Sequence, residues 1–344
     1  MENKAMIAMS GGVDSSVAAH LMIEQGFGCV GATMRLLPDF DPQDARAVAE
    51  KMGMEFHVLD MQAEFRDAVM TEFVRCYEAG LTPNPCTACN RRIKFGALLD
   101  AALALGCDYI ATGHYAQIEQ QDGHFFLKKA ADTAKDQSYF LYALTQHQLS
   151  HTLFPLGGLT KEEVRHIAEQ QGFVNARKKD SQDVCFIPDG DYFAFLQRYT
   201  GKTYPAGDFL DMDGRVVGRH CGAAAYTRGQ RKGLGLSMGR PVYVTGKDMA
   251  ANTVTVGDNE ALFSTTLLAD DWIFSAFDSL TAPLRCKAKA RSRMTEQPAT
   301  FYPEENGLCR VVFDEPQRAL TTGQAVVLYD GDLVLGGGTI REVL

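Results

Sequence analysis

The order of apolar and polar positions predicts an alternating α/β arrangement in the first third of the chain. Short apolar runs alternate with amphipathic stretches in which apolar residues recur at helical spacing. The runs cover 5–9, 29–34 and 56–59, and the amphipathic stretches lie near 15–25, 42–52 and 62–79. This order is typical of βαβ units with a parallel sheet. A helix at 93–105 and a strand at 109–112 complete the predicted layer.

The pattern changes after this layer. Helical spacing continues at 146–153, 161–171 and 191–199, and from about Gly201 the chain turns to short β-rich runs punctuated by Gly and Asp. Those runs include 241–244, 253–256, 310–313 and 325–329. Such spacing is typical of barrels. We therefore expect a Rossmann-like parallel-sheet domain with a helical part over 1–200, a central β-rich domain over 201–270 and a C-terminal β-barrel over 271–344.

Composition excludes several classes of protein. The chain has 344 residues, of which 46% are hydrophobic and 22% charged, so neither a disordered nor a collagen-like protein is expected. No apolar run approaches the ~20 residues that a membrane span needs, and residues 1–4 resemble neither a secretory signal nor a transit segment. We expect a cytoplasmic protein without a membrane partner. Nine cysteines in such a chain favour free thiols, catalysis or metal binding over a disulfide scaffold.

Charge is unevenly distributed along the chain. The formal net charge is −9, and residues 1–83 alone carry −7, which argues weakly against a polyanionic partner. Three later segments contain bases and no acid: 84–95, 215–240 and 285–293. Any one of them can be an ordinary solvated face. Together they favour a surface that binds a nucleic-acid backbone.

A glycine-rich loop follows the first predicted strand and precedes a helix. It reads Ser10-Gly11-Gly12-Val13-Asp14-Ser15-Ser16. Paired glycines let backbone amides approach phosphate oxygens, the serines add hydroxyl donors, and the helix N-terminus favours an anion. The Gly-Lys-Ser/Thr of a Walker A loop is missing. The alternative interpretation is a glycine-rich turn capped by Asp14 or Ser15.

Two further positions are candidates for the same nucleotide site. Met34 ends the second predicted strand, and Gly113 follows the strand at 109–112. An open α/β sheet binds its ligand at the carboxyl ends of its strands. Met34 taken alone is also an ordinary core residue.

Cysteines in polar, basic surroundings are the candidates for thiol chemistry. Cys86 and Cys89 follow Pro83-Asn84-Pro85, a rigid extended approach, and precede Arg91, Arg92 and Lys94. Nearby cations and a helix N-terminus would favour the thiolate of Cys89, and Cys185 also follows a cationic run. The alternative for Cys86 and Cys89 is half of a structural zinc site, but a second Cys/His pair at close spacing is missing.

These motifs together resemble the bacterial tRNA-specific 2-thiouridylase family, whose members have a PP-loop of the ATP pyrophosphatase type in a HUP domain. The resemblance covers nearly the whole chain, in order. It rests on the loop at 10–16, Asn84–Asn90, Lys135–Leu141, the surroundings of Cys185, Tyr226–Gly235 and Leu320–Ala325.

The resemblance implies ATP-dependent exchange of oxygen for sulfur at the 2-carbonyl of the wobble uridine of tRNA. Adenylation releases pyrophosphate and converts the oxygen into a good leaving group, and a sulfur nucleophile then attacks the activated carbon. In this scheme Cys185 carries the persulfide and Cys89 is the nucleophile that helps to release its sulfur. A disulfide between the two then closes the cycle.

The resemblance also implies binding residues and partners. ATP, with Mg²⁺, would contact Ala8, Met9, Ser10, Gly11, Gly12, Val13, Asp14, Ser15, Ser16, Met34 and Gly113. The tRNA would contact Asn84, Pro85, Cys86, Lys135, Asp136, Gln137, Arg291 and Ser292, the first three of them around the flipped target base. Family members often have an aromatic residue at Ser292, so we expect Arg293 to compensate through a phosphate contact. A persulfide donor, either a cysteine desulfurase or a sulfur-relay protein, would be a second partner.

Cys86 departs from the pattern of the family. Many members have an Asp there, which acts as acid/base and touches the target base, whereas a thiol suits that task only if its pKa is depressed. The departure leaves a second mechanism open, in which Cys86, Cys89 and Cys185 are ligands of a [4Fe-4S] cluster. We favour the persulfide route, since thiolates suit both and spacing does not decide between them.

Two other functions stay open from the residues. One is a different adenylating PP-loop enzyme, such as an amidotransferase-type ligase that uses ammonia and needs neither Cys89 nor Cys185. The other is a sensor that binds ATP or an iron–sulfur cluster and RNA without catalysis. Such a sensor would show no tRNA-dependent release of pyrophosphate.

Overall fold

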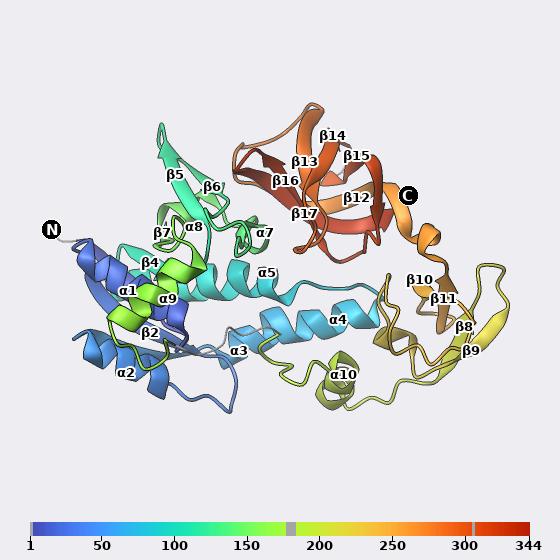
Figure 1. Ribbon diagram of the computed structural model, residues 1–344, viewed down its shortest axis with the longest axis horizontal. Helices are drawn as coiled ribbons and strands as arrows, with labels where there is room; N and C mark the ends of the chain where they lie inside the picture. The colour runs from blue at the N-terminus through green and yellow to red at the C-terminus, as the bar shows by residue number, and fades with distance from the viewer. Residues whose placement is uncertain (1–2, 177–183, 305–306) are drawn as a thin grey trace.

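Five parallel strands form the sheet of the first domain in the computed structural model, which describes residues 3–176, 184–304 and 307–344. The strands are β1 (Lys4–Ala8), β2 (Gly28–Arg35), β3 (Glu55–Asp60), β4 (Tyr109–Thr112) and β7 (Thr152–Leu153). Their order across the sheet is β3-β2-β1-β4-β7, and every neighbouring pair is parallel. The predicted Rossmann-like layer is confirmed (Figure 1), and β1 is the central strand in the order.

Helices cover this sheet and continue beyond it. The regular helices are α1 (Val13–Glu24), α2 (Gln43–Lys51), α7 (Ser138–Leu141), α8 (Gln146–Ser150), α9 (Lys161–Gln170) and α10 (Tyr192–Thr200). Two longer rods each contain a π-helical segment, namely α3 (Gln62–Phe65), η1 (Arg66–Thr71) and α4 (Glu72–Glu78), then α5 (Pro85–Cys89), η2 (Asn90–Ala97) and α6 (Leu98–Ala104). Short π-helical segments are frequent at functional sites.

The second rod begins earlier than the sequence predicts. The Asn84 side chain accepts a hydrogen bond from the Thr87 amide at 3.3 Å, and Pro85 occupies the first helical position. Both features favour a helix start. Cys86 and Cys89 therefore lie within a helix, and the expected extended approach ends at Asn84.

The predicted helix at 146–153 ends early. The Thr152 hydroxyl donates to the carbonyl of Gln148 at 2.7 Å, at the end of α8. The chain then leaves the helix, and Thr152 pairs with Ile110 of β4. The last two residues of the predicted helix form β7 instead.

A hairpin that the hydrophobic pattern does not predict joins the first domain to the last. It consists of β5 (Gln117–Gln121) and β6 (His124–Lys128), and its turn residues Asp122 and Gly123 both have positive φ, at 52° and 82°. Asp-Gly favours such two-residue turns. Lys128 at the end of β6 pairs with Leu333 of β17, so the hairpin extends the C-terminal sheet.

The central domain is a four-stranded sheet. Its strands are β8 (Gly207–Leu210), β9 (Val216–His220), β10 (Tyr243–Asp248) and β11 (Thr253–Gly257), in the order β10-β11-β8-β9. Short helical turns, η3 (Ala223–Ala225) and η4 (Asn259–Leu262), follow β9 and β11.

The C-terminal domain is a β-barrel, as the sequence predicts, and six strands close it. They are β12 (Phe263–Phe274), β13 (Leu284–Lys289), β14 (Gln297–Pro303), β15 (Cys309–Arg318), β16 (Ala325–Asp330) and β17 (Leu333–Val343). The additional pairing of β12 with β17 closes the barrel. The boundary expected between residues 270 and 271 falls within β12, which pairs with β15 from Phe263 onward. We propose a boundary just before Phe263.

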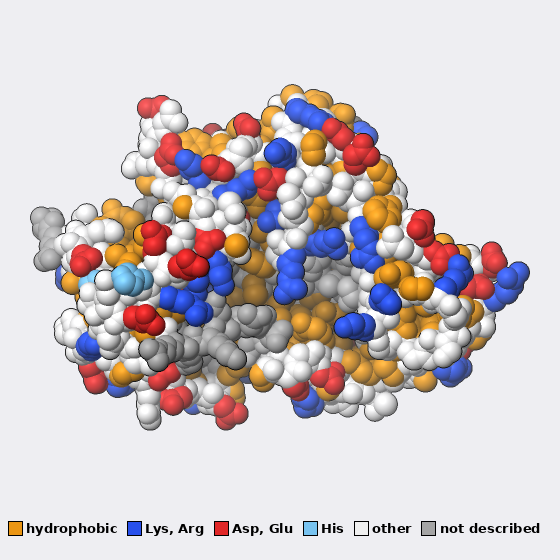
Figure 2. Space-filling model, in the orientation of Figure 1, with side chains coloured by type: hydrophobic (Ala, Val, Ile, Leu, Met, Phe, Trp, Pro, Cys, Tyr) orange, Lys and Arg blue, Asp and Glu red, His pale blue; other side chains and the backbone are white. Residues whose placement is uncertain are grey.

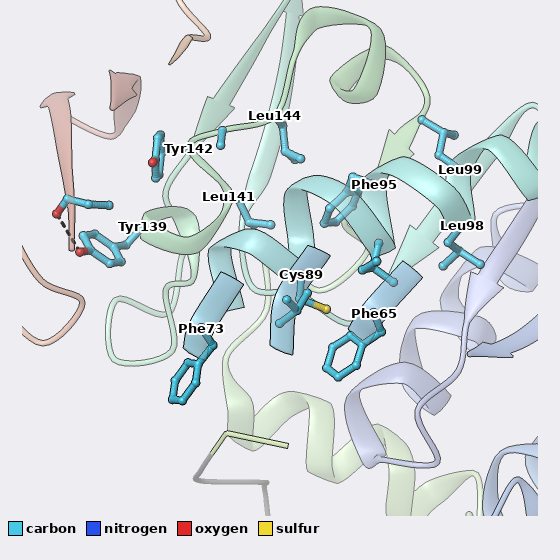
Figure 3. Close-up of a cluster of buried hydrophobic side chains, with 14 of the residues drawn as sticks. Phe65, Phe73, Cys89, Phe95, Leu98, Leu99, Tyr139, Leu141, Tyr142 and Leu144 are labelled. Carbon is cyan, nitrogen blue, oxygen red and sulfur yellow. Dashed lines mark hydrogen bonds between the residues drawn. The ribbon is translucent and has the colours of Figure 1, made fainter. Parts of the chain in front are cut away.

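A large apolar core lies between the helical rods and the segment around α7. Figure 3 shows Cys89 among Phe65, Phe73 and Phe95, with Tyr139 farther along the same cluster. All five side chains are buried, and Phe65 and Phe95 are completely so. In the part of the chain that the structure describes, no helix combines the length and the apolar character that a membrane span needs.

Candidate functional site

The glycine-rich loop connects the central strand of the sheet to α1. The Ser15 and Ser16 hydroxyls donate to the Gly12 carbonyl at 3.0 and 3.1 Å, and the Ser10 amide donates to the Ser15 hydroxyl at 3.2 Å. No side chain among the described residues caps the N-terminus of α1. The first amides of this helix therefore stay available for an anion.

The structure brings the other predicted nucleotide residues to the same edge of the sheet. Ala8 ends β1, Met34 lies near the end of β2, and Gly113 directly follows β4. A Cβ atom on Gly113 would lie 2.8 Å from the carbonyl carbon of Asp14 and from the amide nitrogen of Ser15. Gly113 thus lets β4 approach the loop closely, which the sequence does not reveal. Met9 and Val13 are buried and anchor the two ends of the loop.

Lys161 and Tyr115 hold Asp14, and sequence reasoning missed both. Lys161 Nζ lies 2.7 and 2.8 Å from the two carboxylate oxygens of Asp14, and the Tyr115 hydroxyl donates to the same carboxylate at 2.9 Å. Lys161 is 8% exposed. Thr160 and Glu163 form a capping box that marks the start of α9. Nothing local in the sequence indicates that the first residue of this helix reaches Asp14.

The structure brings Cys86, Cys89 and Cys185 close enough to influence one another's ionisation. Cys86 and Cys185 are exposed, whereas Cys89 is 8% exposed. Phe186, which follows Cys185, packs edge-on against Phe65 in the core around Cys89, and the two ring centroids are 5.8 Å apart. The basic run before Cys185 falls within 177–183, outside the described residues.

The expected depressed pKa at Cys89 is wrong for this conformation. Burial raises the pKa of the Cys89 thiol to about 11, and the Lys94 ammonium offsets only part of that effect. Burial also raises the pKa values of the Cys86 and Cys185 thiols, again opposed by Lys94. Cys89 is the last residue of α5 and lies inside an aromatic core, so desolvation exceeds the effect of the nearby cations.

Lys94 is therefore the cation that the three thiols share. Its ammonium donates to His114 Nε2 at 3.3 Å, and His114 Nδ1 lies 2.7 Å from the Thr112 hydroxyl. Burial, with a smaller contribution from Lys94, holds the pKa of His114 well below its ordinary value. A neutral His114 connects Lys94 to the end of β4, next to the nucleotide loop.

The three thiols do not fit an iron–sulfur cluster as they are arranged. Within 3–176, 184–304 and 307–344, no three Cys, His, Asp or Glu side chains lie close enough together to hold a metal ion. Cys86, Cys89 and Cys185 are thus not gathered into a set of metal ligands in this conformation.

The residues predicted to face RNA near α7 also make hydrogen bonds within the first domain. The Asp136 carboxylate accepts from the Ala130 amide at 3.0 Å and from the Ser138 hydroxyl at 2.8 Å. The side-chain oxygen of Gln137 accepts from the Tyr115 amide at 2.9 Å. Asp136 and Gln137 therefore position this segment, and Lys135 begins it.

On the barrel, Arg291 and Ser292 lie in the turn that follows β13. The Arg291 side chain is exposed, and Ser292 is half-buried.

The basic segments are less free of acids in space than in sequence. Asp271 pairs with Arg91 at 2.7 Å, and Asp258 pairs with Arg240 at the same distance. Arg228 is turned inward, donating to the carbonyls of Thr245 and Ala261. Among the described residues, these Lys and Arg side chains of the three segments have no ion-pair partner: Arg92, Lys94, Arg228, Arg231, Lys232, Lys287, Lys289, Arg291 and Arg293. Figure 2 shows Lys and Arg side chains gathered along the hollow beneath the barrel.

A cavity of about 500 Å³ lies between the helical rods and the barrel. Asn84, Pro85 and Thr87 line it from α5, and Asp271 and Arg341 line it from the barrel. Its lining does not include Cys86 or Cys89. Asn84 and Pro85 thus line this cavity as expected for the pocket of the flipped base, whereas Cys86, which the resemblance places in the same pocket, does not.

Family models match the chain in three consecutive parts. Residues 3–189 match the tRNA methyl transferase HUP domain, 193–258 the tRNA methyl transferase PRC-barrel domain, and 264–340 the aminomethyltransferase β-barrel domain.

Curated relatives match over nearly the full length. The tRNA-specific 2-thiouridylase MnmA of Acetivibrio thermocellus is 47% identical over 357 residues, covering 99% of each chain. That of Symbiobacterium thermophilum is 48% identical and covers 99% of this chain and 93% of its own. That of Clostridioides difficile is 45% identical and covers 100% and 99%.

Proposed function

Because the chain belongs to the tRNA-specific 2-thiouridylase family, we propose that it replaces the 2-oxygen of the wobble uridine of tRNA by sulfur in an ATP-dependent reaction. The observation that carries this proposal is the close placement of the three thiols around Lys94, which His114 connects to the strand beside the nucleotide loop. An activating nucleotide and a sulfur carrier are the two components that the exchange requires.

The loop and its neighbours serve the first step. MgATP binds as substrate with its phosphates at the amides of Gly11 to Ser16. The 2-carbonyl oxygen of the uridine attacks the α-phosphorus, the bond from that phosphorus to the β-bridging oxygen breaks, and pyrophosphate leaves. The dipole at the N-terminus of α1 stabilises the negative charge on the phosphates.

The thiols serve the second step. The terminal sulfur of a Cys185 persulfide attacks C2 of the adenylated uridine, and AMP leaves with the original oxygen. The Cys89 thiolate then attacks the Cys185 sulfur, which releases the thiolated uridine and leaves a Cys89–Cys185 disulfide. In this step the Cys89 sulfur is oxidised and the transferred sulfur is reduced, while the Cys185 sulfur keeps the oxidation level that it had in the persulfide. A thiol reductant must then restore both cysteines. In the structure none of the nine cysteines is in a disulfide.

Exposure of Cys185 supports delivery of sulfur by another protein. A cysteine desulfurase or a sulfur-relay protein is the partner that this chemistry needs, and we place the reaction in the cytoplasm, where tRNA and ATP meet. The misfit of the thiols to a cluster favours the persulfide route over the iron–sulfur one. Cys86 stands at the position where many members have Asp, and because burial raises the pKa of its thiol it would serve there as a proton donor and not as a base.

The RNA would lie along the Lys and Arg side chains of the barrel and central domain that have no ion-pair partner among the described residues. Arg291 and Ser292 would contact it from the barrel, and Asn84 and Pro85 from the cavity beside α5. Lys135 would contact it directly, whereas Asp136 and Gln137 would act by positioning their segment.

Reconstituted thiolation tests the proposal. Unmodified tRNA, MgATP and a persulfide donor are combined with the protein, and thiolated tRNA is detected by its retardation in a mercury-containing gel, alongside release of labelled pyrophosphate. We expect Cys89→Ser and Cys185→Ser to abolish thiolation while tRNA-dependent pyrophosphate release persists. Cys221→Ser, which alters an exposed thiol of the central domain, is the matched control.

Two results would redirect the assignment. Full thiolation by both cysteine variants would exclude the thiol mechanism. Activity without either thiol is what an ammonia-using ligase of the same superfamily predicts. The absence of tRNA-dependent pyrophosphate release from the wild-type protein would indicate a non-catalytic sensor.

A further inference from the structure

Asn175 contacts the nucleotide loop from beneath. Its side-chain amide nitrogen donates to the Gly11 carbonyl at 3.0 Å and lies 2.9 Å from the Ser16 hydroxyl. Asn175 is 4% exposed. Its side-chain oxygen is also buried and has no partner among the described residues. Burying a polar atom without a partner lowers stability. The presence of Asn175 here therefore calls for an explanation, which we seek in its bonds to the loop.

The Gly11 carbonyl sets the direction of the next amide. In a trans peptide, the C=O of one residue and the N–H of the next point in opposite directions. The Gly11–Gly12 peptide is trans. Since the Gly11 carbonyl accepts from Asn175, the Gly12 N–H points to the opposite side of the peptide plane, where it donates to the Ser10 hydroxyl at 3.4 Å.

This peptide has an unusual freedom to rotate. Glycine stands on both sides of it, and Gly11 has a φ of +72°, in the left-handed region that glycine tolerates. A flipped peptide would present the Gly11 carbonyl oxygen, instead of the Gly12 N–H, to a bound phosphate. The partly negative Gly11 carbonyl oxygen would then face the negative phosphate oxygens. The loop would lose the Gly12 N–H as a hydrogen-bond donor and gain a carbonyl that repels the phosphate.

We propose that Asn175 is a positioning residue that locks the Gly11–Gly12 peptide plane, so that the Gly12 N–H stays directed at the phosphates of ATP. The proposal rests on the ATP-binding part of the proposed function. Asn175 acts through the loop and does not itself touch the nucleotide. Asn175 follows α9, so this contact to the loop comes from a segment more than 150 residues away in the sequence.

The test measures equilibrium binding of MgATP to the full chain without RNA, by titration calorimetry. Asn175→Leu keeps the approximate shape and removes both hydrogen bonds, and we expect it to weaken ATP binding about tenfold, as the loss of one well-placed donor implies. Asn175→Asp places a carboxylate against the Gly11 carbonyl and should weaken binding at least as much. The measurement uses no RNA, so it can be interpreted even if the protein proves unable to thiolate tRNA.

A glycine-labelled NMR spectrum separates positioning from mere stabilisation. The Gly12 amide signal should shift on addition of MgATP in the wild-type protein and should shift much less in Asn175→Leu. Thr152→Val is the control, because it removes another buried hydrogen bond of the same domain, from Thr152 to Gln148. It should bind ATP within twofold of wild type.

The outcomes decide the proposal in either direction. ATP affinity within twofold of wild type in a folded Asn175→Leu protein would overturn it. Should that variant not fold, Asn175→Asp and Asn175→Ala take its place, and an unchanged affinity and Gly12 shift in them would overturn it equally.

Discussion

Lys161 Nζ lies within 2.8 Å of both carboxylate oxygens of Asp14, across 147 positions of sequence. Asp14 is in the first turn of α1, beside the amides that the phosphates of ATP would meet. A carboxylate there stabilises the free helix but repels a triphosphate. The Lys161 ammonium neutralises that repulsion and fixes the orientation of the side chain.

Replacement of Lys161 by Met should therefore raise the KM for ATP by about tenfold and lower the stability by ~1–3 kcal/mol, since a half-buried carboxylate loses its counter-charge. Steady-state kinetics with varied ATP and a urea titration measure the two effects. Lys161→Arg, which keeps the charge, should recover much of the ATP affinity.

A double-mutant cycle isolates the pair. Asp14→Asn combined with Lys161→Met should be less destabilised than the sum of the single changes, because neither charge is then left alone. Strict additivity would contradict the idea that the two side chains act as a unit.

The free Cys89 thiol should be unreactive near neutral pH. Its raised pKa, about 11, is caused by burial, and only the thiolate is nucleophilic. Iodoacetamide at pH 7.5, followed by peptide mass spectrometry, should label the exposed Cys221 well before Cys89. Labelling of Cys89 should accelerate by about tenfold per pH unit between pH 7.5 and 9.5, since the thiolate fraction rises toward the pKa. A rate at Cys89 that is fast and independent of pH in this interval would refute this account.

Bases without an ion-pair partner should contribute most to tRNA affinity. Arg231→Glu and Arg291→Glu should each weaken tRNA binding, and the slope of log Kd against log salt should fall by about one for each phosphate contact that is lost. Filter binding over a range of salt concentrations gives both quantities. Arg46→Glu and Arg66→Glu, in the acidic first domain, are the controls, and equal losses from them would contradict a localised RNA surface.

Arg91 should behave differently from these bases. It pairs with Asp271 of the barrel, so Arg91→Glu breaks a contact between domains as well as removing a charge. Adding Asp271→Arg should restore the pair in reverse and recover stability without recovering the salt dependence. Recovery of tRNA affinity in full would mean that Arg91 acts only through Asp271.

The layered fold could be predicted because its signals are local. Over the first hundred residues, apolar runs alternate with stretches in which apolar residues recur at helical spacing. The β-rich sequence after Gly201 predicts the central sheet and the barrel. The Asp122-Gly123 turn is also a local signal, although the pattern of apolar positions alone does not reveal its hairpin. Such features depend on neighbours within a few positions.

The parts that could not be predicted depend on distant partners. The capping box at Thr160 marks a helix start but not the reach of Lys161 to Asp14. Basic residues around Cys89 suggest a thiolate, yet its burial depends on Phe65 and Phe73 of another rod. Segments without acids suggest an open basic face, but in the structure Asp271 of the barrel pairs with Arg91 of one such segment.

Gly113 should tolerate no larger side chain. A Cβ atom there would lie 2.8 Å from backbone atoms of Asp14 and Ser15, which form the start of α1 and cannot move without moving the nucleotide loop. Gly113→Ala should therefore weaken ATP binding by at least tenfold, measured by calorimetry, with a smaller effect on the thermal midpoint. Gly158→Ala is the matched control, because a Cβ atom at Gly158 meets no described atom within 4 Å and its backbone is not left-handed. Unchanged ATP affinity in Gly113→Ala would show that the close approach of β4 to the loop does not set the nucleotide site.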